Sequence, residues 1–98
     1  MHLRILNGTQ ETGLAREVGL RLGAAGHVIE GVGNAAGIRD GGSLLVNRRL
    51  DDAVARRLAA ELGGVAVIRE WDGRCSEDAV LVLGADWSQV LAALTEGR

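Results

Sequence analysis

The sequence contains no lysine, no proline, no phenylalanine and no tyrosine, and these absences exclude several kinds of chemistry. All 11 basic residues are arginine, so neither a Schiff-base lysine nor the lysine of a P-loop is available. Trp71 and Trp87 are the only aromatic residues, too few for the stacked rings that bind single-stranded nucleic acid. A single cysteine, Cys75, excludes an internal disulfide, and with only His2 and His27 as further soft ligands we expect no metal site.

The net charge and the chain length further narrow the classes of partner and of protein to be expected. The formal net charge of −2 is spread along the chain, so we expect no nucleic-acid partner. No apolar run approaches the roughly 20 residues that span a bilayer, so we expect membrane contact only through an upstream anchor. The 98 residues suffice for one domain with a two-layer core. Because the first residues lead directly into a strand, we expect residues 1–98 to be a single domain excised from a longer protein.

The apolar pattern predicts the element order β-α-β-β-α-β-β-α. Strands are predicted at residues 3–6, 27–33, 43–48, 65–71 and 79–84. Helices are predicted at about residues 13–25, from 51 or 52 to 62, and at 86–98. We expect Thr12 to cap the first helix, Gly26 to take a left-handed conformation after it, and Asp51 or Asp52 to cap the second. The polar turn at 72–78 predicts that the last two strands form a hairpin.

Right-handed crossovers would place both crossover helices on one face of the sheet. The sequence therefore predicts an α/β (α+β) fold, a ferredoxin-like split βαβ sandwich with a short C-terminal helix. The stretches "VAVI" and "AVLVLG" are apolar on both sides, unlike strands with one wet face. We therefore expect the second face to be covered by the C-terminal helix carrying Trp87 or by a partner subunit. Both Trp71 and Trp87 are expected in the core.

The stretch "LNGTQETGL" joins the first strand to the first helix and allows three interpretations. It is a structural turn, a polar contact site for glycan or peptide, or a phosphate site at a helix start. Leu14 stands where a P-loop requires lysine, which argues against the last of these. In the structural interpretation Asn7 bonds local backbone amides and Gly8 takes a positive φ, so that any ligand contact depends on Thr9.

A second loop begins at Asn34, at the end of the second strand. If that strand runs parallel to the first, its end lies beside the Asn7 loop, and the two loops form one rim. The alternative is that Asn34 simply opens a loop in a left-handed conformation. Arg48 and Arg49 are adjacent in the sequence and have the chemistry to bind an anion. Asp51 and Asp52 are close enough in the sequence to neutralise them, which favours solvated charge pairs.

No catalytic group is indicated. Cys75 would meet His27 only through a tertiary coincidence, and Ser43 and Ser76 lie in no nucleophile-elbow context. The turn "DGRCSED" has carboxylates but lacks the ligand order of a calcium loop. We therefore predict that the chain is not an enzyme, that Cys75 is an inert thiol, and that no cofactor or metal is bound.

Four short motifs occur in order along the chain: "LNGT", "GLA", "GNA" and "LGAD". With their spacing they resemble the C-terminal accessory domain of LytR/CpsA/Psr cell-envelope proteins, over residues 5–87. The sequence departs from this family pattern in the third strand, where Asn47-Arg48 replaces the usual aromatic residue.

The resemblance implies a non-catalytic module on the outer, extracytoplasmic side of a bacterial membrane, tethered by an upstream helix. It implies a binding or interaction role in the cell envelope, with peptidoglycan or a wall glycopolymer as a possible ligand, or a protein as partner. Within that reading the candidate ligand-binding residues are Asn7, Gly8, Thr9 and Asn34. The alternative is a structural or homodimerisation module that acts through an apolar sheet face.

Overall fold

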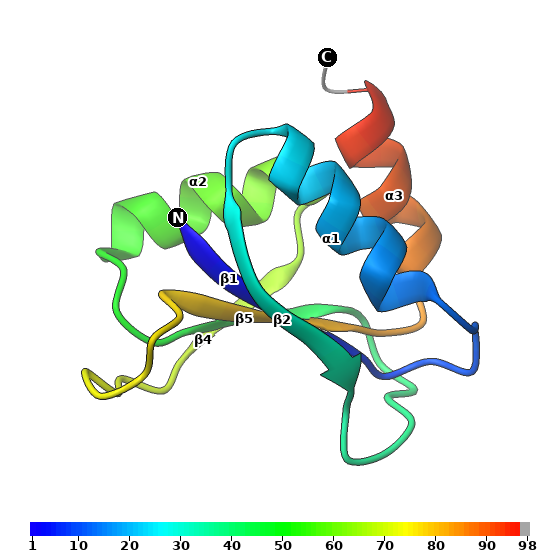
Figure 1. Ribbon diagram of the computed structural model, residues 1–98, viewed down its shortest axis with the longest axis horizontal. Helices are drawn as coiled ribbons and strands as arrows, with labels where there is room; N and C mark the ends of the chain where they lie inside the picture. The colour runs from blue at the N-terminus through cyan, green and yellow to red at the C-terminus, as the bar shows by residue number, and fades with distance from the viewer. Residues whose placement is uncertain (97–98) are drawn as a thin grey trace.

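The computed structural model describes residues 1–96, which form a five-stranded mixed sheet and three helices (Figure 1). The strands are β1 (His2–Asn7), β2 (Val28–Asn34), β3 (Leu44–Asn47), β4 (Ala66–Arg69) and β5 (Ala79–Leu83). The helices are α1 (Leu14–Ala24), α2 (Asp52–Glu61) and α3 (Trp87–Glu96). The predicted element order is confirmed. The last two residues of the predicted third helix, 97 and 98, lie outside the described residues.

The strands lie in the order β2-β1-β5-β3-β4. β1 runs parallel to both β2 and β5, β3 runs parallel to β4, and β3 is antiparallel to β5. The mixed α/β class is confirmed, and the arrangement is consistent with an α+β split βαβ fold in which β5 separates two βαβ units. The predicted hairpin of the last two strands is wrong, because β5 pairs with β1 and β3 while β4 lies at the far edge. β5 is the central strand and is buried on both sides, with Val80 5% and Leu81 0% exposed.

All three helices lie on the same face of the sheet, with α3 beside α1 (Figure 1). Between helices and sheet lies a core of aliphatic side chains, among them Leu3, Ile5, Val18, Leu22, Leu45, Leu58, Leu62, Leu81, Leu83, Val90 and Leu94. Trp87 packs against this core, as predicted. Trp71 is 58% exposed, so its core assignment is wrong; it follows the edge strand β4 and lies under the Arg69 guanidinium, 5.4 Å from the ring centroid.

The sequence predicts that the second face of the sheet, here called the open face, is covered by the C-terminal helix or by a partner. The helix α3 does not cover it, because Val90 and Leu94 of α3 join the core on the helical side. Alternation along the strands places Leu6 on the open face, and the strand register places Val82 and Leu44 beside it. These three side chains are half-buried. Ile68 of β4 lies on the same face and is 40% exposed.

The helix ends differ in part from the expected capping. Thr12 is not the N-cap of α1; Gly13 occupies that position at φ 77°, without a side-chain cap. Asp51 occupies the N-cap position of α2, as predicted, but its side chain makes no capping hydrogen bond. Gly26 has φ 105°, as expected for the left-handed residue after a helix, and Gly63 and Gly64 at φ 90° and 84° end α2 in the same way.

Truncation of Leu58 tests the assignment of α2 to the core. This side chain is 0% exposed, so Leu58→Ala removes a fully buried isobutyl group and is expected to lower the free energy of unfolding by roughly 2–5 kcal/mol. Urea denaturation followed by circular dichroism measures the change. The control is Arg57→Ala on the exposed side of the same helix, expected within about 0.5 kcal/mol of wild type. Equal stability of the two variants would contradict the assignment.

Candidate functional site

The parallel pairing of β1 with β2 brings the four predicted ligand-binding residues to one edge of the sheet. Asn7 at the end of β1 is in register with Asn34 at the end of β2, and the Ala35 amide donates to the Asn7 carbonyl at 2.9 Å. The expectation that the two loops share an edge is therefore confirmed. We call Asn7, Gly8, Thr9 and Asn34 the rim.

Asn7 holds the first loop through its side chain. Its Oδ1 accepts hydrogen bonds from the Thr9 amide at 2.9 Å and the Thr9 hydroxyl at 2.6 Å, and its Nδ2 donates to the Glu11 carbonyl at 2.7 Å. The Thr9 Oγ1 in turn accepts a hydrogen bond from the Glu11 amide at 3.1 Å. Asn7 is only 8% exposed. The predicted structural role of Asn7 in bonding local backbone is confirmed.

Gly8 is required by close approach and not by backbone conformation. It has no positive φ, so that part of the prediction is wrong. A Cβ at this position would lie 2.6 Å from the Leu83 carbonyl oxygen and 3.0 Å from the Arg39 Cβ. The Gly8 amide donates to Leu83 O at 3.0 Å, and its carbonyl accepts the Arg39 amide at 2.6 Å. Three chain segments therefore meet at Gly8 with no room for a side chain.

A second hydrogen-bonded junction supports the same edge, and the sequence analysis missed it. The Asp86 carboxylate accepts the Ser43 amide at 2.7 Å and the Ser43 hydroxyl at 2.6 Å, while Ser43 Oγ accepts the Gly84 amide at 2.9 Å. A Cβ on Gly84 would lie 2.7 Å from the Gly42 carbonyl carbon. Ser43 and Asp86 are 43 residues apart, so only the tertiary structure pairs them. The "LGAD" motif, which contains Gly84 and Asp86, was the signal in the sequence for this junction.

The remaining rim groups face solvent. Asn34 is exposed, and its side-chain amide makes no hydrogen bond to another residue in the range 1–96. Thr9 is half-buried, and its hydroxyl oxygen keeps one acceptor site beyond the bonds to Asn7 and Glu11. The rim therefore presents a neutral amide and a hydroxyl from two adjacent strands. This chemistry suits a polar, uncharged ligand better than a phosphate.

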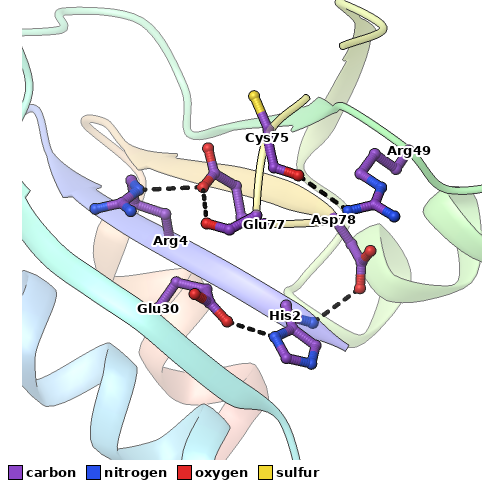
Figure 2. Close-up of polar contacts among 8 residues, drawn as sticks. His2, Arg4, Glu30, Arg49, Cys75, Glu77 and Asp78 are labelled. Carbon is purple, nitrogen blue, oxygen red and sulfur yellow. Dashed lines mark hydrogen bonds and ion pairs between the residues drawn. The ribbon is translucent and has the colours of Figure 1, made fainter. Parts of the chain in front are cut away.

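The opposite end of the sheet carries a network of charged pairs (Figure 2). His2 contacts Glu30 through its ring Nδ1 and donates its backbone amide to Asp78 Oδ2 at 2.9 Å. Arg4 Nε lies 3.5 Å from Glu77 Oε1. In the part of the chain that the structure describes, no three His, Cys, Asp or Glu side chains are placed to hold a metal ion.

The two adjacent arginines that follow β3 are paired differently from the expectation. Arg48 Nη1 lies 3.0 Å from Glu70 Oε1, and Arg49 Nη1 donates to the Cys75 carbonyl at 2.9 Å (Figure 2). Asp52 pairs instead with Arg69, at 2.9 Å. The predicted neutralisation of Arg48 and Arg49 by Asp51 and Asp52 is therefore wrong, because the segment after β4 supplies the partners of both arginines and Arg69 of β4 pairs with Asp52.

Cys75 and His27 lie against different elements. Partial desolvation and the neighbouring Asp72 carboxylate raise the pKa of the Cys75 thiol, which favours the protonated form. His27 lies beside α1 and β2, in a groove of about 440 Å³ that also contacts Gly23 and Ile29. Burial lowers the pKa of His27 from 6.5, the positive N-terminus adds to this effect, and Glu61 opposes it. Its Nδ1 is buried without a hydrogen-bond partner among residues 1–96.

Comparison with known proteins identifies a family for this chain. A family model described as "LytR cell envelope-related transcriptional attenuator" matches residues 1–87. No curated protein sequence and no solved structure shows significant similarity to the chain. Within residues 1–96, no helix has the length and apolar character needed to cross a membrane.

Substitution of Asn7 tests whether its side chain fixes the loop. Asn7→Ala removes three hydrogen bonds and leaves the Thr9 and Glu11 backbone groups without their partner, so the free energy of unfolding is expected to fall by roughly 1–3 kcal/mol. Thr9→Ala removes fewer bonds and is expected to cost about 1 kcal/mol. Urea denaturation of both variants measures the difference. A smaller effect for Asn7→Ala than for Thr9→Ala would contradict the assigned role.

The lowered pKa of His27 predicts a pH-dependent stability. The folded state binds fewer protons than the unfolded chain, so the contribution of neutral His27 is fully present above pH 6.5 and is lost as the pH falls below that value. His27→Gln is therefore expected to flatten the dependence of the urea midpoint on pH between about 7.5 and 5.5. An unchanged dependence in this variant would show that other groups cause it.

Proposed function

The chain belongs to the LytR C-terminal domain family of cell-envelope accessory domains, and from this premise we propose that it is a non-catalytic binding module that contacts peptidoglycan or an attached wall polymer. Its place would be the extracytoplasmic side of a bacterial envelope, within a longer membrane-tethered protein. The ligand would be held at the rim, with Thr9 and Asn34 as the contacting side chains and with Asn7 and Gly8 as their support.

The observation that carries this proposal is that some rim residues hold the loop in place while others face solvent. Asn7 and Gly8 are buried and bonded within the protein, whereas Asn34 and part of Thr9 face solvent. A hydroxyl and an amide held on strand ends lose little conformational freedom when they bind, which favours affinity. Glycans and short peptides present hydroxyl, amide and carbonyl groups that match them.

The ionisable groups support a role without catalysis. Glu77 and Glu70 lie beside Arg4 and Arg48, at 3.5 Å and 3.0 Å, and are held as ion pairs. The raised pKa of Cys75 disfavours the thiolate that a nucleophile needs. These pairs fasten segments of the chain to one another, and within the described residues 1–96 no acid–base pair converges on the rim.

A second candidate function is a structural or homodimerisation module acting through the open face. The observation that favours it is the apolar character of that face, where Ile68 is 40% exposed near half-buried Leu44 and Val82. A contiguous apolar patch of this kind marks an interface when it is large enough. Ile68→Asp would place a charge on it and separate such a dimer without touching the rim.

Binding to purified sacculi, with and without attached wall polymer, tests the first candidate. Wild-type protein is expected to sediment with at least one preparation. Thr9→Ala and Asn34→Ala are each expected to weaken binding roughly fivefold, the loss of about one hydrogen bond of 1 kcal/mol. The matched control is Thr95→Ala on α3, away from the rim, which is expected to bind like wild type.

Two outcomes would contradict the rim proposal. The first is retention of wild-type binding in the double variant Thr9→Ala/Asn34→Ala with its fold intact by circular dichroism. The second is failure of the wild-type protein to bind either preparation. In the second case, a dimer in light scattering that Ile68→Asp converts to monomer would favour the open-face function instead.

A further inference from the structure

The groove beside His27 lies between α1 and the edge strand β2, apart from the rim and from the open face. Its volume is about 440 Å³. Its lining is mainly apolar or small and consists of Arg16, Gly19, Leu20, Gly23, Ala24, His27, Ile29 and Val32. The close approach of α1 to β2 is made possible by Gly19, where a Cβ would lie 3.2 Å from Val32 Cγ1. The groove therefore results from the way α1 packs against β2.

β2 also offers unpaired backbone groups. It is the outer strand of the sheet and pairs with β1 on one side. The Ala35 amide points toward β1, and because strands alternate with a period of two, the Val32 and Asn34 amides point away from it. No proline or lysine protects this edge; a register shift opposite Leu3 and Arg4 interrupts only its first part.

Exposed aliphatic side chains border the groove on both elements. Leu20 of α1 is 62% exposed, Val32 of β2 is 47% exposed and Val28 is 49% exposed. Beside Leu20 lie Gly19 and Gly23, which have no side chains to fill the space. A protruding leucine and an apolar hollow are thus next to each other on one helix. This is the self-complementary pattern that a two-fold interface requires.

We propose that the β2 edge and the α1 groove form a two-fold interface with a second copy of this chain. The two β2 strands pair antiparallel, which extends the sheet across both copies and satisfies the outward amides of Val32 and Asn34. The two α1 helices then cross antiparallel, and Leu20 of each copy enters the groove of the other. The Arg16 side chains lie at opposite ends of this pair, so the like charges are kept apart.

The exposed leucine favours a second copy over an added peptide strand. A single strand laid against β2 would satisfy the edge amides but would leave much of Leu20 in water. A second copy brings its own α1 along with its β2 and so covers both elements. Among the residues that line the groove, Arg16 and His27 are the only ionisable ones. Burial lowers the pKa of His27, which favours the neutral ring near neutral pH, and no carboxylate is among the residues that line the groove.

The test is the mass of the chain in solution, measured by sedimentation velocity over a wide concentration range. Wild-type protein is expected to be a dimer at the upper concentrations. Val32→Pro removes an outward edge amide while leaving the bonds to β1 in place, and it is expected to weaken dimerisation at least roughly tenfold. Leu20→Glu keeps a good helix former and places a charge at the centre of the interface, and the same loss is expected.

Val67→Pro on the other edge strand is the matched control. The Glu70 amide donates to Asn47 O at 3.0 Å, so the Val67 amide points outward from β4 as the Val32 amide does from β2. Val67 is 36% exposed. This variant is expected to dimerise like wild type, and so is Ile68→Asp on the open face.

Circular dichroism shows which variants are folded, and Leu20→Glu decides the test if Val32→Pro unfolds. A wild-type monomer at every concentration would overturn the proposal. So would a dimer that persists in folded Leu20→Glu, or one that only Val67→Pro or Ile68→Asp separates. Asn34 belongs to both surfaces, but its backbone amide serves the interface and its side chain serves the rim, so Asn34→Ala keeps the pairing amide. The outcome is separable from wall binding, because Thr9→Ala also leaves the interface intact and Leu20→Glu leaves the rim intact.

Discussion

The burial of β5 on both faces is the constraint on which the rest of the structure depends. This strand is last in the chain but central in the sheet, between β1 and β3. Its parallel pairing with β1 places Leu83 beside Asn7, and its antiparallel pairing with β3 places Leu44 opposite Val82. Two βαβ units that would each have an open edge are thereby joined into one sheet. Both hydrogen-bonded junctions at the rim edge follow from this insertion.

The two junctions explain why residues that leave no room for a side chain lie together at one edge of the sheet. Gly8 and Gly84 lie where backbone segments approach too closely for a side chain. Asp86 bonds Ser43 and so ties the chain after β5 to the start of β3. These residues make the frame, whereas Asn34 and part of Thr9 lie outside it and face solvent.

Local signals in the sequence were sufficient for much of this structure. Apolar periodicity identified the elements and their order, and the parallel β1–β2 pairing correctly placed Asn34 beside Asn7. The strand order was not predictable in the same way. The stretch "AVLVLG" is apolar on both sides, which predicts a cover on the second face by the C-terminal helix or by a partner subunit. The helix packs on the first face instead, and the stretch forms the central strand of the sheet. The Ser43–Asp86 bond and the exposure of Trp71 likewise depend on which segments the completed sheet brings together.

We propose that this edge of the sheet is the surface that contacts the cell wall. This proposal is tested most directly by titrating isotopically labelled protein with soluble peptidoglycan fragments and recording backbone amide chemical shifts. We expect shifts concentrated in residues 8–13 and 34–43, with the α1 groove and the open face unchanged. Shifts confined to β4 and the open face, or no shifts at saturating fragment, would contradict it.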